Sequence, residues 1–557
     1  MTRREWFTGS PIRVDALKRQ AANTAPDAGG REGEARPPGT IRNRVGLLLG
    51  PALALIVLAL PPPLGFHATA ASLASTIPGG VSPELLVESM QRVSALLLLM
   101  VVWWVTEAVP LPVTALLPGA VLPLLNVWGV SQGAAVPLTL AEISSSYASP
   151  VIFLFLGGFL LAAAMRKWRL DLRITLWMLS RGNLASDSRA VLLAMMLVSA
   201  FLSMWISNTA TAALMLPLGL GLLSHMGCRP GSSRFGTAVM LGIAWGAGIG
   251  GVGTIIGTPP NGIALGILQS TVGDTQGGVP LSFASWMSIG IPFVAFFLPV
   301  AWLVLLAVFP PEVHRIKGGK ELLKADYRAL GPTSPGERGT ITVLLMAAAA
   351  WLLLPFREEL LPASLATHLA WLDEYTVGIL AGVALFLVPV DLRRGRFVLE
   401  WADTRYVEWG ILLLFGGGIA LSHALFLTGL ASWSASSFVS MFGAPSQAVT
   451  LATVVVLVDG LTEVTSNTAV VSMVVPVLIS IARETGQSPT ALAVAAAMAS
   501  SMAFMLPVAT PPNALAYTSG YVQIKDMIRA GIVLDLLGAI TVVLVVLVLG
   551  SAVMGLF

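Results

Sequence analysis

Charge is scarce in this sequence. Only 11% of its 557 residues are Asp, Glu, Lys or Arg, whereas soluble domains carry about 25% charged residues. At the same time, 55% of the residues are hydrophobic. So few charges cannot cover so much apolar material with a water-facing surface, and a water-soluble globular protein is therefore excluded.

Cysteine is almost absent as well, since Cys228 is the single one, and this excludes a disulfide scaffold. The 36 proline and 55 glycine residues are dispersed without period, which excludes a collagen-like repeat. The net charge is only +3. Its basic residues lie in short stretches between apolar segments, which indicates orientation in a membrane rather than nucleic-acid binding.

Apolar runs of about 20 residues recur along the chain, each long enough to cross a bilayer. The sequence therefore predicts an all-α polytopic membrane protein with about 11 transmembrane helices. They are expected over residues 45–61, 92–108, 110–127, 148–166, 236–270, 286–309, 340–356, 374–390, 406–426, 488–520 and 530–556. Residues 1–44 are polar and rich in Arg, Pro and Gly, and we expect a disordered cytoplasmic tail there rather than a signal peptide.

Two further apolar stretches, about 188–227 and 432–481, are each interrupted by a Ser-Asn-Thr motif. If both enter the membrane and return to the same side, only three of the 32 basic residues lie at the outer face. That distribution fits the positive-inside rule. We therefore expect two re-entrant hairpins, with the N-terminus in the cytoplasm and the C-terminus outside.

The two interrupted stretches belong to an internal repeat. Residues 203–210 match residues 462–469 at an offset of 259 residues, and downstream the Thr-Pro-Pro-Asn motif of 258–261 returns in 510–513. The number of spans between them places the halves in opposite orientations. Such an inverted-topology repeat is typical of secondary transporters, which bind substrate where the repeats meet. Each Thr-Pro-Pro motif is expected to break its helix, because proline lacks a backbone donor and restricts the residue before it.

The repeated motifs supply neutral oxygens. Ser203 and Thr462 each precede a Ser-Asn pair by four and five residues, which predicts that the three side chains share one helical face beside the broken helix. Hydroxyl, amide and carbonyl oxygens suit a small hard cation. No Lys or Arg lies within 190–228 or 406–482, so a bound anion would be held by helix N-termini, Asn and Thr side chains and bound cations.

Together these motifs resemble those of the divalent-anion/sodium symporter family, the sodium/dicarboxylate carriers. The resemblance runs from about Val45 to the C-terminus and rests on residues 103–118 and 163–168 and on both pairs of repeated motifs. It implies a sodium-coupled symporter, not an enzyme, that carries C4 to C6 dicarboxylates such as succinate, malate and fumarate across the cytoplasmic membrane. A dicarboxylate exchanger, or a carrier of sulfate, phosphate or citrate, remains the alternative.

The resemblance also implies residue roles at the two hairpin tips and the two broken helices. One sodium site would use Ser203, Ser207, Asn208 and Gly257, and the other Thr462, Ser466, Asn467 and Ala509. The substrate carboxylates would contact Asn208, Thr209, Thr258, Asn467, Thr468 and Thr510. Sodium is the coupling ion, and neither a cofactor nor a nucleic-acid partner is implied.

A homodimer in the lipid bilayer is implied too, with a transport domain that moves as an elevator against a static scaffold. The chain would divide into the tail (1–44), scaffold helices (45–170 and 340–430), two parts of the transport domain (171–310 and 431–557) and a cytoplasmic loop (311–339).

Several other features have two explanations. Glu107 and Glu463, carboxylates at membrane depth, are functional candidates, with a contact at a helix end as the alternative. Residues 246–251 match a dinucleotide-binding pattern, but no strand precedes them and close helix packing explains the glycines. Residues 166–171 are more heavily charged than the family pattern, and we expect them to lie away from the site. An intramembrane enzyme lacks support, since the membrane segments hold no recognisable catalytic motif.

Overall fold

The structure is a computed structural model that describes residues 41–77, 81–181, 187–272, 281–312 and 319–554. Within these ranges, eight helices are long and apolar enough to cross a membrane. They are α2 (Ile41–Ala59), α4 (Pro83–Thr106), α8 (Pro150–Lys167), α14 (Phe283–Val308), α16 (Pro335–Leu353), α20 (Trp409–Leu427), α23 (Asn467–Thr485) and α26 (Ile524–Met554). All except α23 coincide with expected crossings, and the all-α polytopic membrane fold is confirmed.

The remaining expected crossings are short or broken helices. Two short helices, α5 (Leu111–Ala115) and α6 (Leu117–Leu124), replace the third crossing, and α19 (Glu374–Leu387) forms the eighth. The other helices of the described ranges are α3 (Phe66–Ala74), α7 (Leu140–Tyr147), α9 (Leu170–Ser180), α10 (Ser188–Ser203), α11 (Asn208–His225), α12 (Arg234–Gly251), α13 (Pro259–Val272), α15 (Gly319–Ala329), α17 (Arg357–Leu360), α18 (Ala363–His368), α21 (Leu430–Phe442), α22 (Gln447–Thr462), α24 (Pro489–Ala499) and α25 (Pro511–Thr518). The 3-10 turns are η1 (Ile255–Gly257), η2 (Leu354–Phe356), η3 (Leu392–Arg394) and η4 (Trp401–Tyr406). Two small antiparallel pairs complete the described part, β1 (Trp128–Ser131) with β2 (Ala134–Pro137) and β3 (Pro389–Asp391) with β4 (Arg396–Phe397).

The first helix begins earlier than expected. It starts at Ile41 rather than at Val45, so residues 41–44 belong to α2 and the expected tail boundary is wrong by four residues. Arg42, in the first turn, lies 3.4 Å from the carboxylate of Glu107, and this ion pair tethers the polar first turn. The rest of the expected tail, residues 1–40, lies outside the described residues.

Both Thr-Pro-Pro motifs break their helices, as expected. Helix α12 ends at Gly251 and α13 begins at Pro259, while α24 ends at Ala499 and α25 begins at Pro511. In each case the proline pair forms the first turn of the second helix, where missing backbone donors cost nothing. The expected crossings over 236–270 and 488–520 are thus two broken helices.

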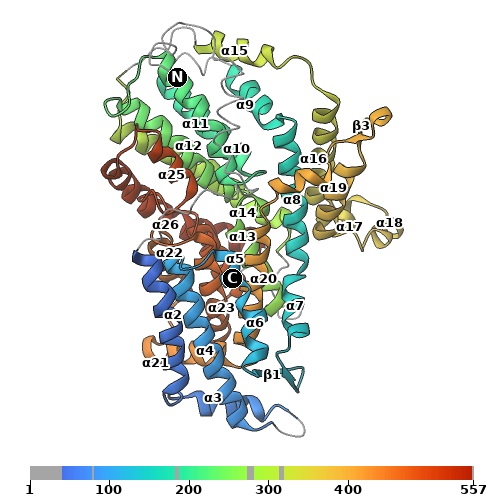
Figure 1. Cartoon of the computed structure of the whole chain (residues 1–557), viewed down its shortest axis with the longest axis vertical. Helices are drawn as coiled ribbons and strands as arrows, with labels where there is room; N and C mark the ends of the chain where they lie inside the picture. Colours follow the sequence, from blue (N-terminus) through green and yellow to red (C-terminus); the bar gives the residue numbers. More distant parts are fainter. Residues whose placement is uncertain (1–40, 78–80, 182–186, 273–280, 313–318, 555–557) are drawn as a thin grey trace.

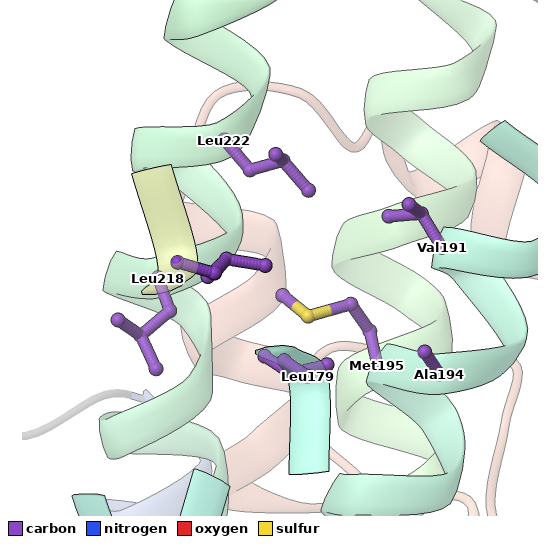
Figure 2. Close-up of a pocket in the computed structure, with 7 residues that line it drawn as sticks. Leu179, Val191, Ala194, Met195, Leu218 and Leu222 are labelled. Atoms are coloured by element: carbon purple, nitrogen blue, oxygen red, sulfur yellow. The ribbon is translucent and has the colours of Figure 1, made fainter. Parts of the chain in front are cut away.

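Helices α10 and α11 form the first hairpin. Val191 and Met195 on α10 face Leu218 and Leu222 on α11 across an apolar pocket, as Figure 2 shows. These positions lie at similar distances before and after the turn at residues 204–207, so the chain doubles back there. The first expected hairpin is confirmed.

Helices α22 and α23 form the second hairpin. Gln487, just beyond α23, donates from Nε2 to Pro445 O at 3.0 Å and lies 3.1 Å from Thr450 Oγ1. Pro445 lies just before α22 and Thr450 lies in its first turn, so the ends of the two helices away from the turn meet. The chain turns at residues 463–466, and the second expected hairpin is confirmed.

Each hairpin also packs against the broken helix of the other half: α11 contacts α25, and α23 contacts α13. Beyond the end of α25, Tyr521 Oη donates to Cys228 O, 2.9 Å away at the base of the first hairpin. Arg483 Nη2, at the base of the second hairpin, donates to Thr271 O at the end of α13, 2.5 Å away. The broken helix α12–α13 therefore runs from the base of one hairpin to the base of the other. The hairpins approach the break from opposite ends, which confirms the inverted repeat.

The apolar core divides into two clusters. The smaller one gathers α3, α4 and the short helices that follow around Trp104, and the larger one gathers α8, both hairpins and both broken helices. Helix α20 lies between them, with Phe415 in the larger cluster and Leu421 in the smaller. In Figure 1, α2 to α6 occupy the lower part of the molecule and α10 to α12 the upper part.

Candidate functional site

The first hairpin tip brings a hydroxyl and an amide together. Helix α10 ends at Ser203, and Ser207 is the N-cap of α11, with its Oγ accepting from Ala210 N at 3.4 Å. Ser203 Oγ donates to Asn208 Oδ1 at 2.5 Å across the turn. The expectation that these side chains share one helical face is wrong, because the helix ends between them. The turn itself, rather than helical periodicity, clusters the oxygens.

The second tip repeats this contact. Thr462 Oγ1 lies 2.5 Å from Asn467 Oδ1 and 2.8 Å from Ser500 O, a carbonyl just after the end of α24. Ser466 again occupies the N-cap, here without a side-chain bond to the backbone. Thr462 Oγ1 therefore has one amide oxygen and one backbone oxygen beside it, the kind of donor set that a hard monovalent cation takes.

An asparagine secures the unwound segment in each half. Asn261 Nδ2 lies 3.1 Å from Gly251 O and 2.8 Å from Thr254 O, two carbonyls at the helix break. In the other half, Asn513 Nδ2 lies 2.9 Å from Ala503 O and 3.1 Å from Leu506 O. Every partner is shifted by the same 252 residues, so both halves use one amide to join the same two carbonyls at the helix break.

In the first half, the tip and the unwound segment pack backbone to backbone. Thr254 Oγ1 donates to Met204 O, 2.6 Å away in the tip. A Cβ at Gly251 would lie 2.5 Å from Asn208 Oδ1, and one at Gly257 would lie 2.5 Å from Gly251 O and 2.9 Å from Ser203 O. Such approaches leave no room for a side chain. They bring Ser203, Asn208 and Gly257, three residues assigned to the first sodium site, together.

In the second half, carboxylates hold the unwound segment against the tip. Glu463, at the tip, accepts from Met505 N at 2.8 Å and from Leu506 N at 3.0 Å. Asp535, on α26, accepts from Phe504 N at 3.3 Å. The segment before Ala509 is thus tied to Thr462 through its neighbour Glu463. Glu463 ends α22 next to Thr462, so the structure shows the contact at a helix end that the sequence analysis gave as the alternative to a functional role.

The residues expected to contact substrate lie around these tips. Half-buried positions are Asn208, Thr209, Asn467, Thr468 and Thr510, whereas Thr258 is buried. The side chains of Thr209 and Thr468 have no hydrogen-bond partner among the described residues, although each stands at the start of a helix. Thr510 Oγ1 accepts from Asn513 N at 3.4 Å. Two unpaired hydroxyls, one from each tip, are therefore free for a ligand.

A pocket lined by both polar and apolar side chains reaches the first tip at Ser207. Its lining includes Arg166, Asp171, Tyr406 and Glu408. The expectation that residues 166–171 lie away from the site is wrong, because Arg166, at the end of α8, and Asp171, at the start of α9, line the same pocket as Ser207 of the tip. The cavity thus adds a basic side chain that the motifs lack.

Other functional candidates escaped the sequence reasoning. Asn261 and Asn513 close both repeated Thr-Pro-Pro motifs, so the duplication alone could have selected them. Asp459 and Asp535 are carboxylates inside long apolar helices, a signal as strong as the one that selected Glu463. Thr254 carried no such signal, because the matching position in the second half is a leucine, Leu506.

Glu107 belongs to a helix end rather than to the site. It ends α4 in a left-handed conformation, its side chain is half exposed, and it pairs with Arg42. In the described part of the chain, no group of three or more His, Cys, Asp and Glu side chains is arranged to hold a metal ion.

Comparison with known proteins gives consistent results. A family model described as "Sodium:sulfate symporter transmembrane region" matches residues 75–556. The sodium-dependent dicarboxylate transporter SdcS of Staphylococcus saprophyticus is 35% identical over 520 residues, covering 92% of each chain. Its counterpart from Staphylococcus aureus is 34% identical with the same coverage. Among solved structures, the YdaH transporter of Alcanivorax borkumensis matches with a TM-score of 0.52 at 15% identity, covering 82% of this chain and 99% of that one.

Proposed function

Because the chain belongs to the sodium:sulfate symporter family, we propose that it is a sodium-coupled symporter of C4 to C6 dicarboxylates such as succinate, malate and fumarate. It is a membrane transporter and not an enzyme. The observation that carries the proposal is the duplicated tip, with matching 2.5 Å contacts of Ser203 to Asn208 and of Thr462 to Asn467. The names of the staphylococcal relatives support sodium and a dicarboxylate as the transported species.

The coupling ions would bind at the two tips. One sodium ion would be held by Ser203, Ser207, Asn208 and backbone at Gly257, where glycine packing brings these groups together. All of its donors are neutral oxygens, which suits a monovalent ion because a charged cage would favour divalent cations.

The other sodium ion would be held by Thr462, Ser466, Asn467 and backbone at Ala509. To this set the geometry adds Ser500 O, 2.8 Å from Thr462 Oγ1. The same kind of neutral donors occurs at both tips, so two ions of one kind are a natural consequence of the duplication.

The substrate would lie between the tips. Each tip begins a helix, α11 or α23, and presents an unpaired threonine hydroxyl there, Thr209 or Thr468. A helix N-terminus attracts an anionic group. A dicarboxylate has two such groups, one for each tip, and Thr258, Thr510 and both tip asparagines would complete the contacts. The two sodium ions would offset part of its charge, so neither solute binds well alone.

Transport would require the site to face each side of the membrane in turn. We assign the movement to the hairpins and broken helices, over 171–310 and 431–557, which would move as an elevator against scaffold helices over 45–170 and 340–430. The scaffold would form a homodimer in the cytoplasmic membrane. The first half's cavity at Ser207, with Arg166 in its lining, would be the route between the tip and the cytoplasm.

The test is uptake of labelled succinate into proteoliposomes that contain the purified protein. An inward sodium gradient, with no substrate inside, should produce accumulation that potassium does not support. Uptake that needs a preloaded dicarboxylate would instead identify an exchanger. The family description names sulfate, so unlabelled sulfate, phosphate and citrate are the competitors, and inhibition by sulfate stronger than by malate would overturn the dicarboxylate assignment.

A further inference from the structure

A short β-hairpin precedes one long helix in each half of the chain. The β1–β2 pair precedes α8, and the β3–β4 pair precedes α20. Helices α8 and α20 begin at Pro150 and Trp409, which are 259 residues apart, the offset of the internal repeat. The two β-hairpins are therefore counterparts within that repeat.

Each β-hairpin packs against the end of the other half's long helix. A Cβ at Gly129 of β1 would lie 2.6 Å from Leu427 Cβ, at the end of α20. In the other half, Trp168 follows α8 and donates from Nε1 to Val398 O, 2.9 Å away and just after β4. Because an inverted repeat places α8 and α20 in opposite directions, the two β-hairpins lie at opposite faces of the membrane. In Figure 1, β1 lies in the lower part of the molecule and β3 in the upper part.

The two β-hairpins differ in charge. Residues 128–141 include no Asp, Glu, Lys or Arg, and the turn between β1 and β2 is Gln132-Gly133. The turn between β3 and β4 carries Arg393 and Arg394, and Arg396 begins β4; all three are exposed. Since the uncharged β-hairpin forms and packs without arginines, the architecture does not require them. Their presence in the second half needs another explanation.

Acidic groups nearby do not neutralise these arginines. Asp391 Oδ1 accepts from the backbone N–H of Arg393 at 3.1 Å and of Arg394 at 3.3 Å, which fixes the turn. Its carboxylate also lies 3.6 Å from Arg394 Nε. Within the described part of the chain, the side chains of Arg393 and Arg396 form neither an ion pair nor a hydrogen bond. At least two positive charges therefore project from a fixed turn without a protein partner.

Apolar side chains beside the turn extend the lipid-facing surface of α19. Leu380, Val383 and Leu387 are exposed and lie on one face of this membrane helix. Beyond the helix, Leu392 in the turn is 73% exposed and Trp401 at the start of η4 is 77% exposed. An apolar patch of this kind next to basic residues marks a surface that meets a partner or a membrane. Its continuity with the lipid-facing side of α19 points to the membrane.

The length of α19 places the turn at the level of the headgroups. The helix has 14 residues, which span about 21 Å, whereas the hydrocarbon core is about 30 Å thick. Its last carbonyls are bonded by the strand that returns: Leu385 O accepts from Leu399 N at 2.9 Å, and Val388 O from Val398 N at 3.0 Å. The β3–β4 pair therefore continues the crossing where the helix ends, and its turn reaches the membrane surface.

We propose that the β3–β4 turn binds the headgroups of anionic phospholipids. Arg393, Arg394 and Arg396 contact the phosphates, while Leu392 and Trp401 enter the adjoining layer of acyl chains. In the orientation expected from the basic residues, this turn lies in the cytoplasmic leaflet, whose surface is negative. The uncharged counterpart then lies in the other leaflet. This lipid site is separate from the transport site and does not depend on which anion the protein carries.

A fluorescent label beside the turn measures which lipid surrounds it. The label is attached at Ala402→Cys in a Cys228→Ser background, because Ala402 is exposed and follows Trp401. The full chain is reconstituted in phosphatidylcholine vesicles that contain increasing fractions of brominated phosphatidylglycerol or brominated phosphatidylcholine, and bromine near the headgroup quenches the label.

Each arginine at an anionic surface changes the local lipid affinity about fivefold. Half-maximal quenching should therefore need at least about tenfold less phosphatidylglycerol than phosphatidylcholine. Equal quenching by the two lipids, or none by either, would overturn the proposal, and this comparison requires no charge variant to fold.

The charge variant is Arg393→Gln combined with Arg394→Gln and Arg396→Gln, which should abolish the preference for phosphatidylglycerol. Its control is Lys324→Gln combined with Arg328→Gln, because both are exposed basic residues of α15, away from the turn. The control should keep the preference. An equal loss in the control would show that the general charge of this face attracts the lipid, and would overturn the assignment to the turn.

The uncharged β-hairpin provides a control within the same molecule. A label at Ala134→Cys, an exposed position at the start of β2, should be quenched equally by both lipids. A similar preference there would overturn the role of the arginines. Inorganic phosphate added to the vesicles should leave the quenching unchanged, and complete displacement would identify a site for soluble anions instead. None of these readings requires transport, so failure of succinate uptake would overturn only the proposed function.

Discussion

The two halves of this protein solve one structural problem in two ways. Both must hold an unwound segment against a hairpin tip inside a membrane, and both use the same asparagine amide on the same pair of carbonyls. The first half then relies on glycine packing and one neutral hydroxyl, that of Thr254. The second half has alanines in place of the glycines and relies on two carboxylates. Shared geometry can therefore rest on steric fit in one copy and on charge in the other.

The role of the asparagine amide, which both halves share, can be tested with Asn261→Asp and Asn513→Asp. Each replaces an amide donor by an acceptor that faces two buried carbonyls. An unpaired buried acceptor costs roughly 1–3 kcal/mol, so with two carbonyls affected we expect uptake to fall on the order of a hundredfold or more in both variants. Uptake per monodisperse, membrane-inserted protein is the measurement. A large loss in one half and none in the other would contradict the common role.

The role of glycine packing in the first half can be tested with Gly257→Ala and with the reverse change at the matching position of the second half, Ala509→Gly. At Gly257 a Cβ would lie 2.5 Å from a backbone carbonyl that cannot move aside cheaply. Overpacking of this kind costs about 1–3 kcal/mol, so the sodium concentration for half-maximal uptake should rise roughly tenfold or more. Ala509→Gly removes a methyl group and should change the sodium concentration for half-maximal uptake less than about threefold. Equal effects of the two variants would show that the halves are packed alike.

Substitutions at the two tips can test which residues contact sodium and which contact substrate. Thr209→Ala and Thr468→Ala each remove an unpaired hydroxyl, and a lost hydrogen bond to a charged group costs about 1.5–3 kcal/mol. We expect the succinate concentration for half-maximal uptake to rise about tenfold with little change in sodium dependence. Ser207→Ala and Asn467→Asp should instead change the sodium dependence. Loss of both dependences to the same degree in all four folded variants would contradict these assignments.

The smallest effect is expected at Thr254, which has no hydroxyl counterpart in the second half. Thr254→Val removes the bond that its hydroxyl donates to Met204 O and the bond that it accepts from Gly257 N at 3.1 Å, two neutral contacts worth about 0.5 kcal/mol or more each. Sodium half-saturation should shift about fivefold, and thermal stability in detergent should fall slightly. Leu506→Val, at the matching position of the other half, is the control. If Leu506→Val has an equal effect, the hydroxyl is not what holds the first tip.

Much of this architecture was accessible from the chain alone. Apolar length predicted the crossings that became α2, α8 and α26, because a bilayer imposes a minimum length on each helix. The Thr-Pro-Pro motifs predicted both breaks, because proline acts on its own backbone. Helical periodicity gave the wrong geometry for Ser203 and Asn208. The helix ends between them, and the turn at residues 204–207 brings their side chains together.

The sequence by itself determined which segments cross the membrane, where two of them break, and that the chain contains two matching sets of neutral oxygens. These properties are local, since they depend on hydropathy, proline and motif spacing within a few dozen residues. Only the tertiary structure decided that Glu463 and Asp535 hold the same unwound segment, that Arg166 lines a cavity at the first tip, and that each hairpin packs on the broken helix of the other half. Such contacts join residues far apart in the chain, and their free energy comes from packing and charge pairing that no local pattern records.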